Sequence, residues 1–307
     1  MFSNLPAFRS LVGAGMRLTA LPLPALPLML AMALGLAGCK EAPLPAHPAL
    51  WSVTDRQGHE GWLFGTVHSA PAPLDWHSGA IDTALGQART IMVEVGNLRD
   101  DAAVAATFAQ LAKTTNAPPL TQRVAPADRK ALLQLMERGG MRDSQFARMD
   151  TWAAALMLAR NADADTNAEN GVDRAILGLA HGRPVHELEG AEKQLGIFDQ
   201  LPEREQRDLL AAVVRDASAT SDLDLVERWR AGDMEAIAAE TRKGMLADPE
   251  LREALYTARN RAWLTQIEQA IRNDRRPFVA VGAAHMAGNE GLVTLLQRAG
   301  YTVRRIQ

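Results

Sequence analysis

The sequence predicts an α/β protein whose mixed sheet is built from strands near both ends of the chain, with a large helical layer or insertion over about residues 100–274. Strand-like apolar runs occur near the two ends, whereas apolar residues between them recur with helical spacing. Neither end alone supplies enough strands to bury a face of a sheet, so we expect the first and last strands to join one sheet.

Two runs near the start predict a β-hairpin. Leu50–Thr54 and Trp62–Thr66 flank a polar, glycine-containing turn at Arg56–Gly61. A helix is expected at Ser78–Ala88 and a third strand at Thr90–Val95. A strand, a helix and another strand in this order indicate a right-handed parallel crossover.

The rest of the chain is predicted to be helical until strands return near its end. Pro184–Leu188 predicts a fourth strand, and Arg276–Val281 and Tyr301–Ile306 predict two more, separated by a helix at Gly288–Gly300. Further helices are expected at Pro202–Asp216, Asp222–Ala231, Asp233–Arg242 and Pro249–Asn273.

Residues 1–38 are predicted to be an export signal and no part of the fold. Arg9 and Arg17 are the only charged residues before Cys39, and residues 18–38 are apolar apart from one threonine. The run ends in Leu-Ala-Gly-Cys, a lipobox that resembles those of bacterial lipoprotein precursors. In such precursors the chain is cut before the cysteine, so Cys39 is the expected lipidation site.

An uncleaved membrane-spanning helix is the alternative, since a run of this length just spans ~30 Å of hydrocarbon. Three prolines in its first half, Pro22, Pro24 and Pro27, argue against a helix. Lys40 after the lipidated cysteine resembles a signal for the outer membrane. We therefore expect a signal peptide at 1–38, a proline-rich tether at 39–48 and a single domain at 49–307, anchored on the periplasmic side of a bacterial membrane.

Composition excludes several classes of function. The chain has 33 basic and 36 acidic residues, a net charge of −3, so bulk charge attracts no nucleic acid. Cys39 is the sole cysteine, which excludes a disulfide and a cysteine-based zinc site. Gly-x-Ser-x-Gly, Walker-type and His-Glu-x-x-His motifs are absent from the sequence.

Two strands near opposite ends of the chain each finish on Gly-x-x-His, at Gly65 to His68 and at Gly282 to His285. Glu94 lies near the carboxyl end of a third apolar strand, where an ionised carboxylate is costly unless it is paired or bound to a cation. Ligands and reactive groups gather at the carboxyl edge of such sheets. Two imidazoles and a carboxylate there would suit a divalent metal with open positions.

Each of these residues also has a purely structural interpretation. Glu94 would form a salt bridge with an arginine of the helical part, and His68 and His285 would be hydrogen-bonded core histidines. Duplication of the motif at two strand ends favours a site, because glycine there permits close approach of the backbone to a ligand.

The chain resembles the TraB/GumN family in several blocks taken in order. The most specific is Val-Gly-Ala-Ala-His-Met-Ala-Gly at residues 281–288; the others include Gly65-Thr66-Val67-His68, the strand with Glu94, Gly171-Val172-Asp173, Leu188-Glu189 and Arg259-Asn260. That family is similar to the Tiki membrane-anchored metalloproteases, and its fold is similar to the erythromycin-esterase-like and ChaN-like folds.

The resemblance implies a set of site residues. His68, His285 and Glu94 would hold a divalent metal, manganese or cobalt by resemblance or else zinc, or Glu94 would act as general base. Arg259 and Asn260 would be polar residues of a helix in the same cleft, steadying an oxyanion. Gly65, Thr66, Gly282, Asp173 and Glu189 would support the site.

Adjacent residues on a helix diverge by about 100°, so Arg259 and Asn260 need not both reach one site. Asp173 is equally explained as an acid at a helix N-terminus, and Glu189 as a sheet-edge carboxylate or a cap for the following helix.

The function expected from the sequence is that of a membrane-tethered, metal-dependent hydrolase of the bacterial envelope, acting on a peptide or protein. The first alternative keeps the hydrolase and drops the metal, with histidine and glutamate as an acid/base pair. The second is a binding or accessory lipoprotein without turnover.

Overall fold

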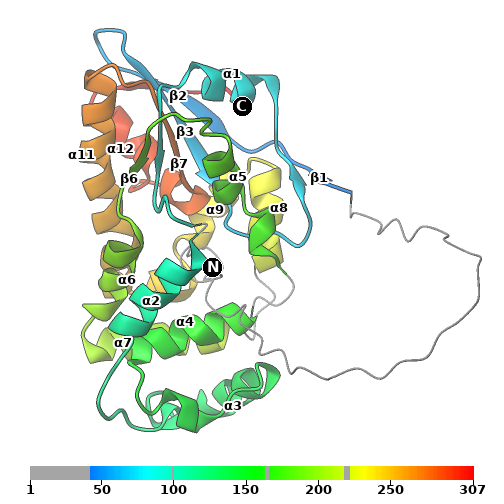
Figure 1. Ribbon diagram of the computed structural model, residues 1–307, viewed down its shortest axis with the longest axis vertical. Coiled ribbons are helices and arrows are strands. Elements are labelled where there is room, and N and C mark those ends of the chain that lie inside the picture. The colour runs from blue at the N-terminus through cyan, green and yellow to red at the C-terminus, as the bar shows by residue number, and fades with distance from the viewer. Residues whose placement is uncertain (1–41, 99, 163–165, 218–221) are drawn as a thin grey trace, which may run out of the picture.

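The computed structural model describes residues 42–98, 100–162, 166–217 and 222–307 (Figure 1). The predicted signal peptide and the lipidation site Cys39 lie outside the described residues. No helix in the described ranges has the length and apolar character to cross a membrane.

A six-stranded mixed sheet is the centre of the fold, with strand order β6-β5-β7-β3-β2-β8. Neighbouring strands pair in parallel from β6 to β3, and β2 pairs antiparallel with both β3 and β8. The strands span Leu50–Thr54 (β2), Glu60–Thr66 (β3), Thr90–Val93 (β5), Val185–Glu187 (β6), Pro277–Gly282 (β7) and Thr302–Arg305 (β8). The sheet is therefore built from both ends of the chain, as predicted.

The hairpin and the parallel orientation of the strands before and after α1 (Gly79–Gln87) are also confirmed, with one addition. β2 and β3 pair through Trp51 and Leu63, and β3 and β5 point the same way. They are not neighbours, because β7 lies between them. A strand from the end of the chain thus completes the sheet begun near its start. β5 ends at Val93, so Glu94 is the first residue beyond the strand.

Helices cover both faces of the sheet because its strands alternate apolar side chains between two cores. One face packs on Gly79–Gln87 (α1), Val172–Gly178 (α5), Asp222–Arg230 (α8) and Met234–Glu240 (α9). The other packs on Ala258–Arg272 (α11) and Leu292–Arg298 (α12). The sheet and the helices on its two faces form a three-layer α/β/α sandwich. Strand β7 is buried along its whole length, as expected for a strand at the centre of this sandwich.

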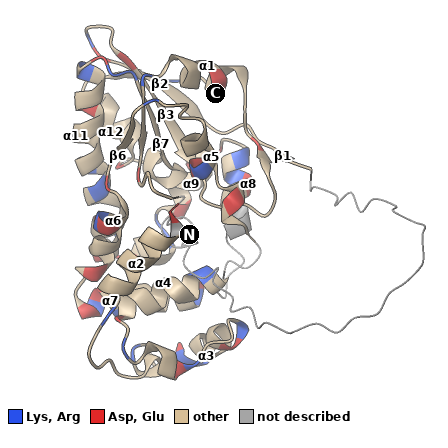
Figure 2. Cartoon of the chain, viewed as in Figure 1, with Lys and Arg blue, Asp and Glu red and all other residues tan. Residues whose placement is uncertain are grey.

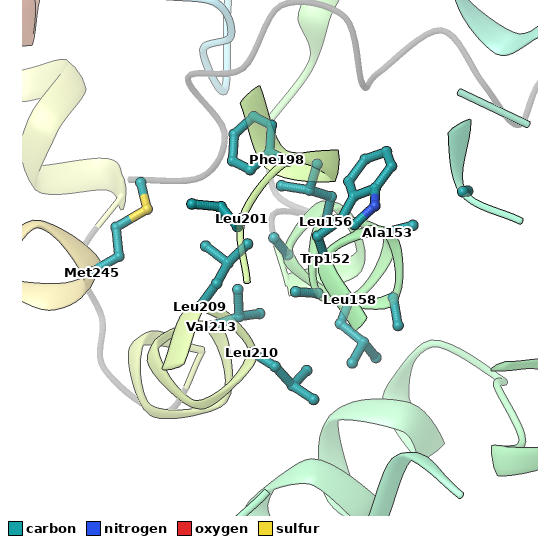
Figure 3. Close-up of a cluster of buried hydrophobic side chains, with 14 of the residues drawn as sticks. Trp152, Ala153, Leu156, Leu158, Phe198, Leu201, Leu209, Leu210, Val213 and Met245 are labelled. Atoms are coloured by element: carbon teal, nitrogen blue, oxygen red, sulfur yellow. The ribbon is translucent and has the colours of Figure 1, made fainter. Parts of the chain in front are cut away.

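A separate helical layer has its own apolar core. Trp152, Leu209 and Phe198 lie in this core (Figure 3). Its helices are Asp101–Leu111 (α2), Arg129–Arg138 (α3), Thr151–Ala162 (α4), Ala191–Asp199 (α6) and Glu203–Asp216 (α7). The segment 100–274 is thus divided: part of it forms this layer, and α5, α8, α9, α11 and β6 belong to the sandwich (Figure 1).

The predicted helix at 249–273 is interrupted. It comprises Pro249–Arg252 (α10), a π-helical turn at Glu253–Thr257 (η7) and α11. A π-helical turn accommodates an extra residue within a helix and shifts the direction of the residues that follow.

Part of the predicted tether contacts the domain. Leu44–Pro45 (β1) pairs with Leu74–Asp75 (β4), and the backbone N–H of His47 donates to the carbonyl of Arg230 at 2.7 Å. Ala46 is buried as well. The chain is therefore held against the domain from residue 44 onward.

Candidate functional site

The site lies where three parallel strands of the sheet end. His68 follows β3, Glu94 follows β5, and His285 lies in a short 3-10 helix (Ala283–Met286, η8) that follows β7. A methyl group on Gly282 would lie 3.3 Å from Oε1 of Glu94 and 3.3 Å from Nε2 of His68, and 3.8 Å from Cδ2 of His285. The three side chains therefore surround one point, as the sequence predicts.

His68 is paired with Asp173, from the first turn of α5. The imidazole Nδ1 lies 2.8 Å from Oδ2 of Asp173, and both side chains are buried. Burial lowers the pKa of His68, but the charge and hydrogen bond of Asp173, together with the charge of Glu94, outweigh burial and raise the pKa above its ordinary value of 6.5. Nδ1–H donates to Asp173, so Nε2 is the nitrogen directed toward Gly282.

Glu94 accepts hydrogen bonds on both oxygens. Oε1 accepts from the backbone N–H of Gly282 at 2.8 Å, and Oε2 accepts from Arg259 Nη2 at 2.8 Å and from Gln194 Nε2 at 3.1 Å. Burial raises the pKa of Glu94, but the Arg259 cation, the two histidines and the Gly282 N–H outweigh it and lower the pKa to about 2. Glu94 is therefore ionised, and the predicted salt bridge to an arginine is present.

Arg259 holds the carboxylates of the site together. Its Nε and Nη2 donate to Glu189 at 3.0 and 2.8 Å, and Nη2 also donates to Glu94. Nη1 donates to the carbonyl of Leu255 at 3.2 Å and lies 3.4 Å from Nε2 of His285. All five N–H groups of the guanidinium therefore have acceptors.

His285 is held in one orientation by Asn260. Its Nδ1 donates to Oδ1 of Asn260 at 2.6 Å, and the Asn260 amide nitrogen donates to the carbonyl of Glu290 at 2.8 Å. Burial and the neighbouring Arg259 cation lower the pKa of His285 to about 3. This imidazole is consequently neutral at physiological pH, with its proton on Nδ1.

Both Arg259 and Asn260 reach the site, although they are adjacent on a helix. Arg259 contacts Glu94 and Asn260 contacts His285. Glu94 and His285 follow the neighbouring strands β5 and β7. Side chains that leave α11 in two different directions therefore both reach the same edge of the sheet.

The predicted supporting glycines act through close packing. A methyl group on Gly65 would lie 2.9 Å from Cα of Ala283, which brings β3 against η8. Thr66 is buried, and its hydroxyl has no hydrogen-bond partner among the described residues. Thr66 lines a small cavity together with His68, Glu94 and Asp173.

The observed contacts give no support to the metal predicted from the sequence. Within the described ranges, no group of three or more His, Cys, Asp and Glu side chains is arranged to hold an ion. The cation in contact with Glu94 is the Arg259 guanidinium, which also lies beside Nε2 of His285. A metal at this point would be repelled by that charge and would compete with Arg259 Nη1 for Nε2 of His285. The metal therefore stays a prediction.

Sequence reasoning missed two partners of the site. Gln194, on α6, binds Glu94, and no pattern in the sequence marks it. Trp263 lies in the core, with the guanidinium carbon of Arg259 4.7 Å from its ring centre and the centre of the His285 ring 4.5 Å from it. The spacing of four residues between Arg259 and Trp263 on one helix is a signal for this stacking.

A pocket opens at the site on the side of the helical layer. It is a shallow pocket, open to solvent, with a cavity volume of about 60 Å³. His68, Gly282, His285 and Arg259 form one wall. The rest of the lining, called the apolar wall here, is formed mainly by Phe198, Met245, Leu246, Leu255 and Tyr256. A small molecule in this pocket would contact the histidines of the site.

A comparison with known protein families finds the family that the motifs of the sequence resemble. No curated protein and no solved structure gives a significant match. The model of the TraB/PrgY/gumN family matches residues 49–305, which include both Gly-x-x-His motifs and every residue of the site described above. The chain therefore belongs to the TraB/PrgY/gumN family.

Proposed function

We propose that the protein is a hydrolase in which His68, oriented by Asp173, activates a water molecule. The observation that supports this most strongly is the 2.8 Å contact between His68 Nδ1 and Asp173 Oδ2, which directs Nε2 toward Gly282 and the pocket. A carboxylate that accepts from one imidazole nitrogen fixes the tautomer and makes the other nitrogen a proton acceptor.

His68 suits the role of general base better than its neighbours. A general base works best when its pKa lies near the working pH. The pKa of Glu94 is about 2 and that of His285 about 3, whereas that of His68 lies above 6.5. At neutral pH, Glu94 and His285 are therefore weak proton acceptors, and His68 is the strongest of the three.

Glu94 would hold the water and the imidazolium. Oε1 of Glu94 and Nε2 of His68 both lie in front of Gly282, so a water held between these two atoms would donate to both. When His68 takes the proton, the buried Glu94 carboxylate and Asp173 stabilise the resulting cation. Hydroxide adds to the substrate carbonyl, and the proton on His68 is then available to the leaving group.

Arg259 and Asn260 act in this proposal as positioning residues. The N–H groups of Arg259 already have acceptors, and the amide of Asn260 bridges His285 and the carbonyl of Glu290. The oxyanion role expected from the sequence would require these bonds to be given up.

The first test is turnover by purified chain beginning at residue 39, measured by mass spectrometry on a mixture of peptides. We expect hydrolysis that is lost in His68→Ala and Asp173→Ala and is unchanged by a chelator. Stoichiometric metal by elemental analysis, together with loss of activity in chelator, would support the metal-dependent alternative instead. Absence of turnover, with the cellular phenotype intact in His68→Ala, would support the binding lipoprotein.

We also propose that the chain acts in the bacterial envelope, anchored through Cys39. The support is the lipobox pattern at the end of the apolar run. Cys39→Ser is expected to move the protein from the membrane fraction to the soluble fraction and to abolish labelling by radioactive palmitate. Equal membrane association of both proteins would contradict the anchor.

A further inference from the structure

The pocket beside the site is lined by two chemically different groups of residues. The polar group contains His68, His285 and Arg259. The apolar wall has five apolar or aromatic side chains, all of which belong to the buried core of the helical layer. A pocket with a few polar groups among apolar side chains orients a ligand through its polar atoms.

The apolar wall is assembled from three separate segments. Phe198 is near the end of α6, Met245 and Leu246 lie in a 3-10 helix at Gly244–Ala247 (η6), and Leu255 and Tyr256 lie in the π-helical turn. Phe198 and Met245 face the same cluster in Figure 3. Tyr256 is fixed by a hydrogen bond from its hydroxyl to the carbonyl of Ala287. The wall is therefore part of a packed core and is preformed.

Charge in the pocket is already compensated. Arg259 is the only Lys or Arg among its described lining residues, and its guanidinium is paired with Glu94 and Glu189. The same lining contains no Asp or Glu. Charges of both signs lie on the outer helices instead, such as α3 and α11 (Figure 2). A charged substrate group in this pocket would lose its hydration without gaining a partner.

From these observations we infer that the pocket selects substrates that carry an uncharged apolar side chain or acyl group next to the bond that is hydrolysed. This inference rests on the proposed function for the position of that bond, which would lie at His68 and Gly282. The apolar group would contact Met245, Leu246 and Leu255. Met245 can adapt to different shapes because its side chain is flexible.

The test measures binding without turnover. N-acetyl-leucinamide, N-acetyl-lysinamide and N-acetyl-aspartamide are titrated against purified wild-type chain and His68→Ala, with binding followed by ligand-observed NMR. We expect the leucine amide to bind about 10-fold or more tightly than the two charged amides in both proteins. Leu255→Ala and Met245→Asp should reduce the preference, whereas Leu133→Asp, a substitution at an exposed residue of α3, should leave it unchanged.

The outcomes separate this inference from the proposed function. Equal binding of the three amides by folded wild-type protein would overturn the inference, even if peptides are hydrolysed. A leucine preference without any hydrolysis would support the apolar pocket and contradict the hydrolase. Circular dichroism checks the fold of Met245→Asp; if that variant is unfolded, Leu255→Ala decides, and an unchanged preference in it would overturn the inference.

Discussion

Asp173 Oδ2 lies 2.8 Å from Nδ1 of His68, although the two residues are 105 positions apart in the chain. Local packing explains how they meet. The backbone N–H of Val172 donates to the carbonyl of Val67 at 2.8 Å, and a methyl group on Gly171 would lie 2.4 Å from the carbonyl oxygen of His68. Residues Gly171 to Asp173 thus pack the start of α5 against the residues that follow β3. This packing places the Asp173 carboxylate beside the His68 imidazole.

Asp173→Asn should shift the pH dependence of activity. In the wild type, activity should rise as His68 loses its proton, through a pKa above 6.5. An amide no longer favours the imidazolium, so the rise should move to lower pH, and activity should fall about 10²- to 10⁴-fold. Initial rates from pH 5 to 9 measure both effects. An unchanged profile would show that Asp173 serves only the fold.

The same substitution should lower the free energy of unfolding, and it should do so more at low pH than at high pH. Because the folded pKa of His68 is raised, its contribution is fully present below pH 6.5 and is lost as the pH rises through the folded value. The wild type should exceed Asp173→Asn by about 1–3 kcal/mol in urea unfolding at pH 6. The difference should be smaller at pH 9, and a larger one there would contradict the pairing.

The two histidines of the site should titrate differently. His285 has a pKa of about 3 and donates Nδ1–H to Asn260, so its ring should stay neutral from pH 5 to 9. The pKa of His68 is raised above 6.5, so its ring should lose its proton at a higher pH than an ordinary histidine does. NMR spectra of protein with labelled histidine, assigned with His68→Gln and His285→Gln, measure the two shifts. A His285 resonance that titrates near pH 6.5 would contradict this arrangement.

The sequence predicted the sheet and the convergence of its ends, because strand-ending Gly-x-x-His motifs are local signals. It left open whether Arg259 and Asn260 share a site, since a regular helix turns adjacent residues apart. The structure joins both to the site because they contact different partners, Glu94 and His285, which no simple periodicity reveals. Asp173 and Glu189 had equally good local interpretations as helix-end acids, and only tertiary contacts distinguish their partners.

Glu94→Gln should lower the free energy of unfolding at neutral pH and make it less dependent on pH in acid. The folded pKa of Glu94 is lowered to about 2, so its contribution is present above about pH 4.5 and is lost as the pH falls toward 2. Removing the charge leaves buried Arg259 with Glu189 as its remaining carboxylate, at a cost of about 3 kcal/mol at pH 7. Urea unfolding of both proteins at pH 7 and pH 3 measures this. The difference between them should shrink at pH 3.

Gly282→Ala should block the site while the protein stays folded. The new methyl group would lie 3.3 Å from Glu94 Oε1 and His68 Nε2, a distance at which these side chains must give way by a few tenths of an ångström. We expect about 1 kcal/mol of destabilisation and a loss of activity of about 10²-fold, because the methyl group would overlap the reacting water held between these side chains.

Two other glycines provide matched controls for that variant. In α1, a methyl group on Gly86 meets nothing within 4 Å, so Gly86→Ala should raise stability by about 0.5–1 kcal/mol and leave activity unchanged. Gly65→Ala would press a methyl group against the backbone of Ala283 at 2.9 Å and should lower stability by about 1–3 kcal/mol. Thermal unfolding and peptide hydrolysis are measured on all three. If activity follows stability across the set, with Gly282→Ala no more impaired than Gly65→Ala, the space beside Gly282 is not where the reaction occurs.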